Sequence, residues 1–321
     1  MKPIRAVPDP VLIPLQGKQV AQPAVAVPQL RQTRIDEFFQ ARSLAPNTEK
    51  AYRHDLSYFL QWTEQNWADI TPRQIAQFKS HLMEKHIDGQ RIRSDASVRR
   101  ILGTLQTFYA WLYRVRYVSD NPTLAIELPK IPEPEARALT AQQVEKIYQA
   151  AIALKFPERN MALISLLSHG LRASEASALN VSDFEIEKVY IRASKADSKG
   201  YVPIDLDAQM WIQQYLKIRE ADGEILEGES PLLLSHSPRN AGTRMSYNAI
   251  RKLMDKISAQ AGFKVTSHQF RHTFGTEMVL SGMNPYHVRT LMRQKSEQTF
   301  RRYAKAADYI AAEQAFRQHR K

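Results

Sequence analysis

Cysteine is absent from the 321 residues of this chain. The absence excludes disulfides, cysteine-based metal sites and catalysis by a thiol. Long apolar runs are also missing, since no stretch approaches the roughly 18 residues that a membrane-spanning helix needs. Prolines early in the chain would interrupt the apolar core of a signal peptide. We therefore expect an intracellular protein that has no membrane partner.

Acidic residues are the minority among the charged side chains. The chain has 33 Asp and Glu against 45 Lys and Arg, which gives a net charge of +12. Such a surplus favours a polyanionic partner, and nucleic acid is the commonest. Since many basic proteins bind no DNA, the charge is weak evidence until motifs support it.

Prolines are concentrated in residues 1–30. Proline fixes φ and lacks a backbone donor, so neither a helix nor a central strand is expected there. We predict an extended arm over 1–30, which drapes over a partner or stays disordered.

Helical periodicity begins after this arm and continues to about Leu124. Apolar residues recur at helical spacing, and Thr71 followed by Pro72 is a typical helix start. This first domain covers 31–125, and a proline-rich linker over 126–137 follows it. The pattern predicts a small helical bundle with helices at 33–41, 47–65, 71–83 and 94–115.

Basic side chains occupy positions of this bundle that we expect to be exposed. A solvated surface and contacts with DNA phosphates are both consistent with them, and the sequence leaves the choice open. The candidates for DNA contact are Arg53, Lys79, Arg91, Arg93, Arg99 and Arg100.

The second domain, 138–321, begins with a helix that Thr140 can cap, with Gln143 at the reciprocal position of a capping box. The fold class is mainly α with a small β-hairpin, since only two short strands, joined by a polar loop, are predicted. The strands are expected at 189–192 and 201–204, and the later helices at 161–168, 207–219, 246–261, 267–281, 284–292 and 297–304, with a separate tail helix at 306–316.

The helix predicted at 267–281 carries residues suited to phosphate chemistry. His268 and Arg271 stand three residues apart, so both project from one face and can act on one group. A guanidinium is a planar fork that can bind two oxygens of one phosphate, and Tyr303 downstream is a candidate nucleophile. The alternative is a basic helix that only binds phosphate, with Tyr303 as a packed aromatic residue.

A second arginine stands where another helix is expected to begin. Gly170 breaks the chain, and Arg172 follows at the start of an apolar-periodic helix, whose N-terminal dipole also favours anions. Lys195 lies in the polar loop between the two predicted strands, where a long amine can reach into a groove.

Together these motifs resemble the tyrosine recombinase family, the integrases and resolvases of phages, transposons and bacterial chromosomes. The likeness rests on Gly-Leu-Arg-x-Ser-Glu-x-x-x-Leu at 170–179, His-x-x-Arg-His at 268–272 and the tyrosine at 303. The segment 44–56 is similar to the family's N-terminal core-binding domain. The resemblance implies a C-shaped clamp, in which a SAM-like core-binding domain and a catalytic domain close around DNA.

The resemblance also assigns roles to individual residues. Arg172 and Arg271 become the paired guanidiniums on the scissile phosphate, and Tyr303 becomes the nucleophile. Lys195 would protonate the leaving 5′ oxygen, and His268 would take the tyrosine proton or hold a phosphate oxygen. Neither a metal nor any other cofactor is expected.

Three further positions support this set or depart from the family. Glu175 matches an acidic position and would be a partner for arginine, while His272 is expected to be structural and to bond nearby backbone. The family usually has a Gly-His pair where this chain has Arg293 and Gln294. An amide can donate a hydrogen bond to a phosphate oxygen but cannot act as an acid or base, which puts the rate of cleavage in question.

Some assignments have competitors in the sequence. Lys199 competes with Lys195, although the register of the following strand favours Lys195. Tyr309 competes with Tyr303, but it stands too far into the tail helix. Three other tyrosines are assigned to packing: Tyr201, Tyr247 and Tyr286.

The resemblance implies a site-specific DNA recombinase of the mobile-element integrase or resolvase type. It would cut and rejoin DNA through a 3′-phosphotyrosyl intermediate and a Holliday junction, in the bacterial cytoplasm and at the nucleoid. The expected partners are duplex DNA with an inverted-repeat core site, further copies that form a homotetramer through the C-terminal helix, and an accessory protein. A type IB topoisomerase-like enzyme and a DNA-binding protein without catalysis are the alternatives.

Overall fold

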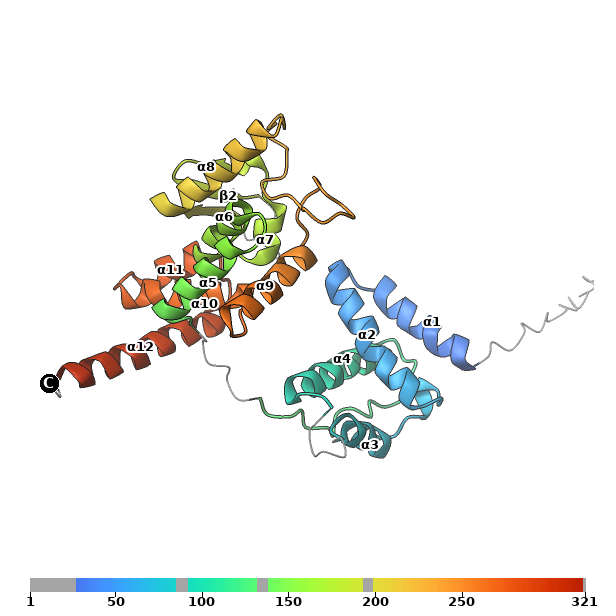
Figure 1. Ribbon diagram of the computed structural model, residues 1–321. Coiled ribbons are helices and arrows are strands. Elements are labelled where there is room, and N and C mark those ends of the chain that lie inside the picture. The colour runs from blue at the N-terminus through green and yellow to red at the C-terminus, as the bar shows by residue number, and fades with distance from the viewer. Residues whose placement is uncertain (1–26, 85–91, 132–137, 193–198, 320–321) are drawn as a thin grey trace, which may run out of the picture. The chain divides into compact units, whose positions relative to one another are not determined.

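The computed structural model describes residues 27–84, 92–131, 138–192 and 199–319. Most of the predicted arm, Arg91 and Lys195 therefore lie outside the described residues. The chain divides into two compact units, Met1–Pro132 and Glu133–Lys321, which are described separately (Figure 1).

The first unit is a helical bundle, as the apolar periodicity predicts. Its first helix begins at Val27, before the expected Thr33, because Pro28 occupies the first turn, where a missing N–H leaves no helix hydrogen bond unmade. Thr71 caps the third helix in a capping box with Gln74. The elements are α1 (Val27–Gln40), α2 (Pro46–Trp62), the 3-10 turn η1 (Trp67–Asp69), α3 (Pro72–Leu82) and α4 (Asp95–Arg114).

Aromatic rings fill the core of this unit. Phe59 stacks on Trp67 with ring centroids 5.4 Å apart and meets Phe78 edge-on at 4.9 Å. All three rings are buried, and Trp67 Nε1 donates a hydrogen bond to the carbonyl oxygen of Arg31 at 3.0 Å. The indole N–H therefore keeps an acceptor inside the core, and this contact ties α1 to the other helices.

One carboxylate is buried between α2 and α4. Asp55 accepts a hydrogen bond from Thr104 Oγ1 at 2.9 Å and another from Arg100. A buried charge is tolerated only when it is paired and hydrogen-bonded, and both conditions hold here. The periodicity predicts the apolar face of α2 but gives no sign of this carboxylate.

The second unit is mainly helical and includes a small antiparallel sheet in the order β1-β2-β3. Val189 pairs with Val202 across β2 and β3, and both side chains face the core. The two predicted strands are confirmed, whereas β1 was not predicted because two residues carry no alternation. The elements are α5 (Ala141–Ala153), α6 (Pro157–Ser168), α7 (Ala173–Ala178), the 3-10 turn η2 (Val181–Asp183), β1 (Phe184–Glu185), β2 (Lys188–Ile191), β3 (Gly200–Pro203), α8 (Leu206–Ala221), α9 (Tyr247–Ala261), α10 (Ser267–Leu280), α11 (Pro285–Leu291) and α12 (Glu297–His319).

Helix α6 is central to this unit, where α5, α8 and α10 pack against it (Figure 1). Leu163, Ile164 and Leu166 point in different directions around the helix, yet none of them is exposed. A helix that is covered on every side has no polar face, which explains the continuous apolar run in the sequence. This burial holds α6 fixed, and with it the turn at its C-terminal end.

The C-terminal helix α12 runs without a break from Glu297 to His319. The sequence pattern predicts two helices here, at 297–304 and 306–316, and that division was wrong. The residues between them, Ala304, Lys305 and Ala306, are strong helix formers, and no Gly or Pro interrupts them. Tyr303 and the tail therefore belong to one helix.

Candidate active site

The turn between α6 and α7 positions the first arginine. Gly170 has a φ of +78°, which disfavours any residue with a side chain. A Cβ at this position would also lie only 2.7 Å from the Phe274 ring, so both the backbone and the packing require glycine. Arg172 follows as the N-cap of α7. Its backbone N–H donates to Glu175 Oε2 at 2.9 Å, and its Nη1 donates to Glu175 Oε1 at 2.6 Å. The predicted helix start at Arg172 is confirmed, and the carboxylate of Glu175 binds both its backbone N–H and its guanidinium.

The second arginine is buried on α10. Arg271 is 1% exposed, and its Nη1 donates to the carbonyl oxygen of Gly170 at 2.6 Å. Its Nη2 donates to the carbonyl oxygen of Met292, the C-cap residue of α11. Burial lowers the pKa of Arg271 to about 10, and the charges of Arg172 and Arg293 act in the same direction. The guanidinium is still cationic at neutral pH, and two separate turns fix its orientation.

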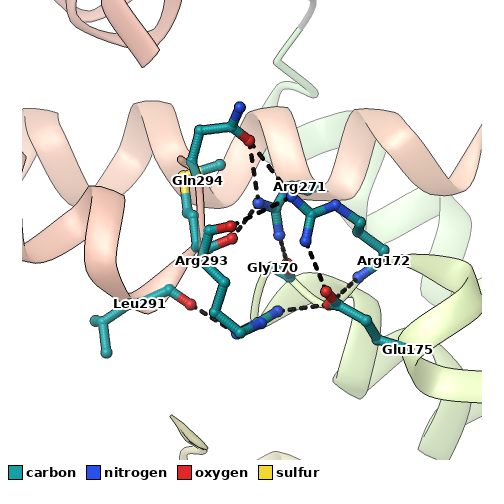
Figure 2. A network of polar contacts seen from close by, with 8 residues as sticks. Gly170, Arg172, Glu175, Arg271, Leu291, Arg293 and Gln294 are labelled. Carbon is teal, nitrogen blue, oxygen red and sulfur yellow. Dashed lines mark hydrogen bonds and ion pairs between the residues drawn. The ribbon is translucent and has the colours of Figure 1, made fainter. Parts of the chain in front are cut away.

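The two guanidiniums converge on one oxygen atom. Arg172 Nη2 and Arg271 Nη2 each lie 3.5 Å from Gln294 Oε1 (Figure 2). These three residues come from three different segments, so the fold rather than the local sequence brings them together. An anionic oxygen in the place of the amide oxygen would face two positive charges at once.

A third arginine, Arg293, completes the network from below in Figure 2. Its Nη2 donates to Glu175 Oε2 at 2.6 Å, and its Nη1 donates to the carbonyl oxygen of Leu291 at 2.7 Å. Burial alone would raise the pKa of Glu175, but the hydrogen bond and charge of Arg293, together with Arg172, hold this pKa below its ordinary value. Sequence reasoning noted Arg293 only as a departure from the family and missed this contact, which spans 118 positions.

Tyr303 packs inside the unit and is 2% exposed. Its ring belongs to an apolar cluster that includes Phe274 and Phe300. Gly275 on α10 makes this approach possible, because a Cβ there would lie 3.0 Å from Tyr303 Cδ1 and 2.8 Å from Met292 Sδ. Tyr303 is therefore a packed aromatic residue, and this packing is compatible with its candidate role as the nucleophile.

The two predicted histidines form a row with the phenol, in which His272 lies between His268 and Tyr303. The His272 ring centroid is 5.2 Å from that of Tyr303, and the His268 centroid is 4.5 Å from that of His272. His268 is exposed and His272 is half-buried, so the row runs from the surface to the buried ring. The expected backbone hydrogen bond of His272 stays a prediction.

The other candidate residues have mixed outcomes. Lys195 lies outside the described residues, and Lys199, its competitor, is exposed next to β3. Tyr309 is 69% exposed on α12. The assignment of three tyrosines to packing was wrong, because each lies at the surface, at an end of a helix or on the outer face of β3. They are Tyr201, Tyr247 and Tyr286, which are between 55% and 69% exposed.

The candidate DNA-contact residues of the first unit bind their own chain. Each described member of the set donates to an acceptor or covers a ring within the unit, which fixes its direction without removing it from the surface. Their role in DNA binding stays a prediction. The contacts join Arg53 to Asp36 and Glu49, Lys79 to the carbonyl of Glu127, Arg93 to the ring of Tyr58, Arg99 to the carbonyl of Pro129, and Arg100 to Asp55.

The part of the chain that the structure describes holds no cluster of acidic or histidine side chains suited to a metal ion. None of its helices combines the length and the apolar character needed to cross a membrane.

Comparison with known families extends over both units. Residues 137–309 match the phage integrase family, and residues 35–115 match the phage integrase N-terminal SAM-like domain. The first match contains all of the clustered residues described above, from Arg172 to Tyr303.

Similar proteins include recombinases and integrases. The tyrosine recombinase XerD of Proteus mirabilis is 28% identical over 85% of this chain and 87% of its own length. Among solved structures, the Tn1549 transposon integrase in complex with a circular intermediate DNA matches with a TM-score of 0.69 at 17% identity, over 89% of this chain and 98% of that one. A lambda integrase tetramer bound to a Holliday junction matches with a TM-score of 0.66 at 19% identity, over 86% of this chain and 76% of that one. These two structures share the fold.

Proposed function

The chain belongs to the phage integrase family, the tyrosine recombinases, and on this basis we propose that it is a site-specific recombinase that cuts and rejoins duplex DNA. The observation that carries the proposal is the convergence of Arg172 and Arg271 on a single oxygen, Gln294 Oε1. A pair of fixed guanidiniums suits a phosphodiester, whose non-bridging oxygens gain charge during attack.

In the proposed reaction, the Tyr303 hydroxyl oxygen attacks the scissile phosphorus. A bond forms between the phenolic oxygen and phosphorus, and the bond from phosphorus to the 5′ oxygen breaks. His268 accepts the phenolic proton or holds a phosphate oxygen, and Lys195 gives a proton to the leaving 5′ oxygen. Arg172 and Arg271 stabilise the charge, and the amide of Gln294 donates a hydrogen bond to a phosphate oxygen.

The product is a 3′-phosphotyrosyl bond and a free 5′ hydroxyl. Because this bond is a phosphodiester like the one broken, a 5′ hydroxyl from another strand can attack it with no external energy source. Exchange of one strand pair between two duplexes gives a Holliday junction, and exchange of the second pair resolves it. The proposed substrate is a core site with inverted repeats, at which the protein acts as an integrase or resolvase of a mobile element.

The burial of Tyr303 adds a step before attack. Because Tyr303 is 2% exposed where α12 packs against α10, we propose that α12 shifts relative to α10 when DNA binds and brings the hydroxyl to the phosphate. Gly275 adds no side chain of its own where α10 meets this ring. We therefore place the nucleophile in a resting position in the protein alone.

Assembly into a tetramer fits the character of α12. A cavity of about 740 Å³ in the second unit is lined by apolar side chains, among them Trp211 and Met278, and by carboxylates. The end of α12 carries exposed Phe316, Arg317 and His319, whose apolar and basic character complements that lining. We propose that the tail of one copy occupies this cavity in the next. The carboxylates are Glu145, Asp205, Asp207 and Glu277.

Covalent trapping tests the reaction. The protein is incubated with a pool of randomised nicked duplexes, and adducts that survive denaturant are counted and sequenced. The native protein and Tyr309→Phe, a matched control for an exposed phenol, should form adducts, and Tyr303→Phe should bind DNA and form none. Adducts with Tyr303→Phe would show that the nucleophile is wrong, and salt-sensitive binding without adducts in every protein would favour a non-catalytic DNA-binding protein.

A second measurement separates a recombinase from a topoisomerase-like enzyme. Sedimentation of the trapped complex should give a species with four copies and two duplexes. A monomer that relaxes supercoils with little sequence preference would favour the topoisomerase-like alternative.

A further inference from the structure

Arg293 has a backbone conformation that a glycine would adopt more easily. Its φ is +51°, in the left-handed region where the Cβ of any other residue is crowded. This strain falls immediately before Gln294, the residue that faces the arginine pair. A side chain that persists in a strained backbone at such a place needs compensating contacts, and the guanidinium of Arg293 makes them.

The guanidinium of Arg293 forms a buried ion pair with Glu175. The two side chains are 3% and 1% exposed, and Nη2 lies 2.6 Å from Oε2. The second donor, Nη1, is bound to the carbonyl oxygen of Leu291. Both partners are therefore fixed in one geometry, and solvent does not compete for either.

Glu175 in turn sets the direction of Arg172. Its Oε1 accepts from Arg172 Nη1 at 2.6 Å, while its Oε2 accepts from the backbone N–H of Arg172 at 2.9 Å. Arg293 binds the same Oε2, so it prevents the carboxylate from turning away from Arg172. The carbonyl oxygen of Arg293 also accepts from Arg172 Nη2 at 3.4 Å. Arg172 is thus held through both the side chain and the backbone of Arg293 (Figure 2).

The stem of Arg293 reaches a further element of the site. A Cβ on Gly200 would lie 3.8 Å from both Cγ and Cδ of Arg293. Gly200 begins β3, and Lys195 stands five positions earlier in the sequence. The Arg293 side chain therefore binds Glu175, which holds Arg172, and its stem lies beside the first residue of β3.

We infer that Arg293 is a positioning residue for DNA cleavage, which orients Arg172 through Glu175 and places Gln294 through its left-handed backbone. We expect no direct contact of its guanidinium with DNA, since the side chain is 3% exposed and pairs with Glu175. The inference rests on the proposed function, because it requires a cleavage step whose rate depends on the direction of Arg172.

The test compares variants of Arg293 with a matched buried arginine outside the site. Arg219 is 4% exposed and pairs with Glu224, and it donates to the carbonyls of Pro231 and Leu232. Measurements are the thermal midpoint, the dissociation constant for DNA, and the single-turnover rate of adduct formation per folded molecule.

Arg293→Gly relieves the strain and removes the guanidinium. Its thermal midpoint should fall less than that of Arg219→Ala, and DNA affinity should stay within about twofold, while adduct formation slows by about tenfold or more, as small misplacements of catalytic groups do. Arg219→Ala should show the reverse, with a lower midpoint and a native rate per folded molecule. Arg293→Met, which keeps the stem against Gly200, should be as slow as Arg293→Gly, and Arg293→Lys should recover part of the rate.

A second comparison separates positioning from general support. If Arg293 acts through Arg172, then adding Arg293→Gly to Arg172→Lys should slow cleavage by less than about twofold beyond Arg172→Lys alone. The inference is overturned if Arg293→Gly or Arg293→Met forms adducts at the native rate, or if the two changes multiply fully. Failure of the native protein to form adducts would instead count against the proposed function.

Discussion

Both units contain a buried carboxylate that pairs with arginine, and Asp55 and Glu175 differ in the balance of charge around them. In the first unit, Asp55 has a fully buried side chain, and its partner Arg100 is 47% exposed. One negative charge meets one positive charge, and the positive one reaches in from solvent. In the second unit, Glu175 lies among Arg172, Arg271 and Arg293, so one carboxylate faces three guanidiniums.

The number of guanidiniums around each carboxylate distinguishes a structural ion pair, at Asp55, from a candidate binding site, at Glu175. The charge of Asp55 is balanced by that of Arg100, and its carboxylate also accepts a hydrogen bond from Thr104. This group therefore carries no excess charge. The cluster around Glu175 leaves a surplus of two positive charges in a poorly solvated place, a situation that costs stability until an anion arrives. This surplus of positive charge suits the binding of an anionic phosphodiester. Without a ligand, the same surplus lowers the stability of the folded protein.

The largest expected change in the free energy of unfolding follows from removing the carboxylate charge of Glu175 or of Asp55. Glu175→Gln leaves Arg293 buried and unpaired, so the free energy of unfolding of the second unit should fall by about 3–5 kcal/mol. Asp55→Asn should cost the first unit less, about 1–3 kcal/mol, because Arg100 can turn to solvent. Urea unfolding followed by signals from each unit measures both, and equal losses would contradict the contrast between the two sites.

A smaller effect is expected when pH replaces mutation. The pKa of Glu175 is lower in the folded protein than in the unfolded chain. Its charge therefore stabilises the fold fully above about pH 4.3, its ordinary value, and this contribution is lost as pH falls through the lower folded pKa.

The measurement is the unfolding free energy between about pH 6 and 3, at constant ionic strength. The native protein should lose stability more steeply at the acid end than Glu175→Gln, which has no carboxyl to titrate at that position. Parallel curves for the two proteins would mean that the ion pairs of Glu175 contribute nothing to folding.

The smallest change in stability is expected for Gln294→His, which leaves the surplus charge in place. An imidazole can accept a hydrogen bond from the arginines or donate one to phosphate, and it can also transfer a proton. We expect cleavage at an equal or faster rate in the trapping assay. A large loss of rate would show that the site is built around the amide, and Gln294→Ala, which can do neither, serves as the slow control.

Local sequence signals predicted most of the fold. The periodicity of α2, the start of α3 at Thr71 and Pro72, and the capping box of Thr140 and Gln143 each depend on residues within a few positions of one another. Such patterns need no knowledge of tertiary structure. The unbroken α12 was missed because the amphipathic tail was interpreted as a new element, although Ala304 and Ala306 favour continuation.

The candidate site was predicted through family motifs, and its supporting contacts were not. Arg172 and Arg271 converge as the resemblance implies, but the pair of Arg293 with Glu175 joins distant segments and leaves no local pattern. The depth of Tyr303 was equally hidden, since it depends on Gly275 across a helix interface. Contacts of this kind are set by packing between elements, which a single sequence does not reveal.

Because α12 is one continuous helix, it connects Tyr303 rigidly to the C-terminal tail. A helix of 23 residues is about 35 Å long, and it transmits a push or a twist with little internal bending. Tyr303 stands near one end of this rod, and the exposed tail forms the other. In the proposed assembly, a neighbouring copy that binds the tail would act on the proposed nucleophile through this one helix, so that the position of each phenol would depend on whether the neighbour is bound.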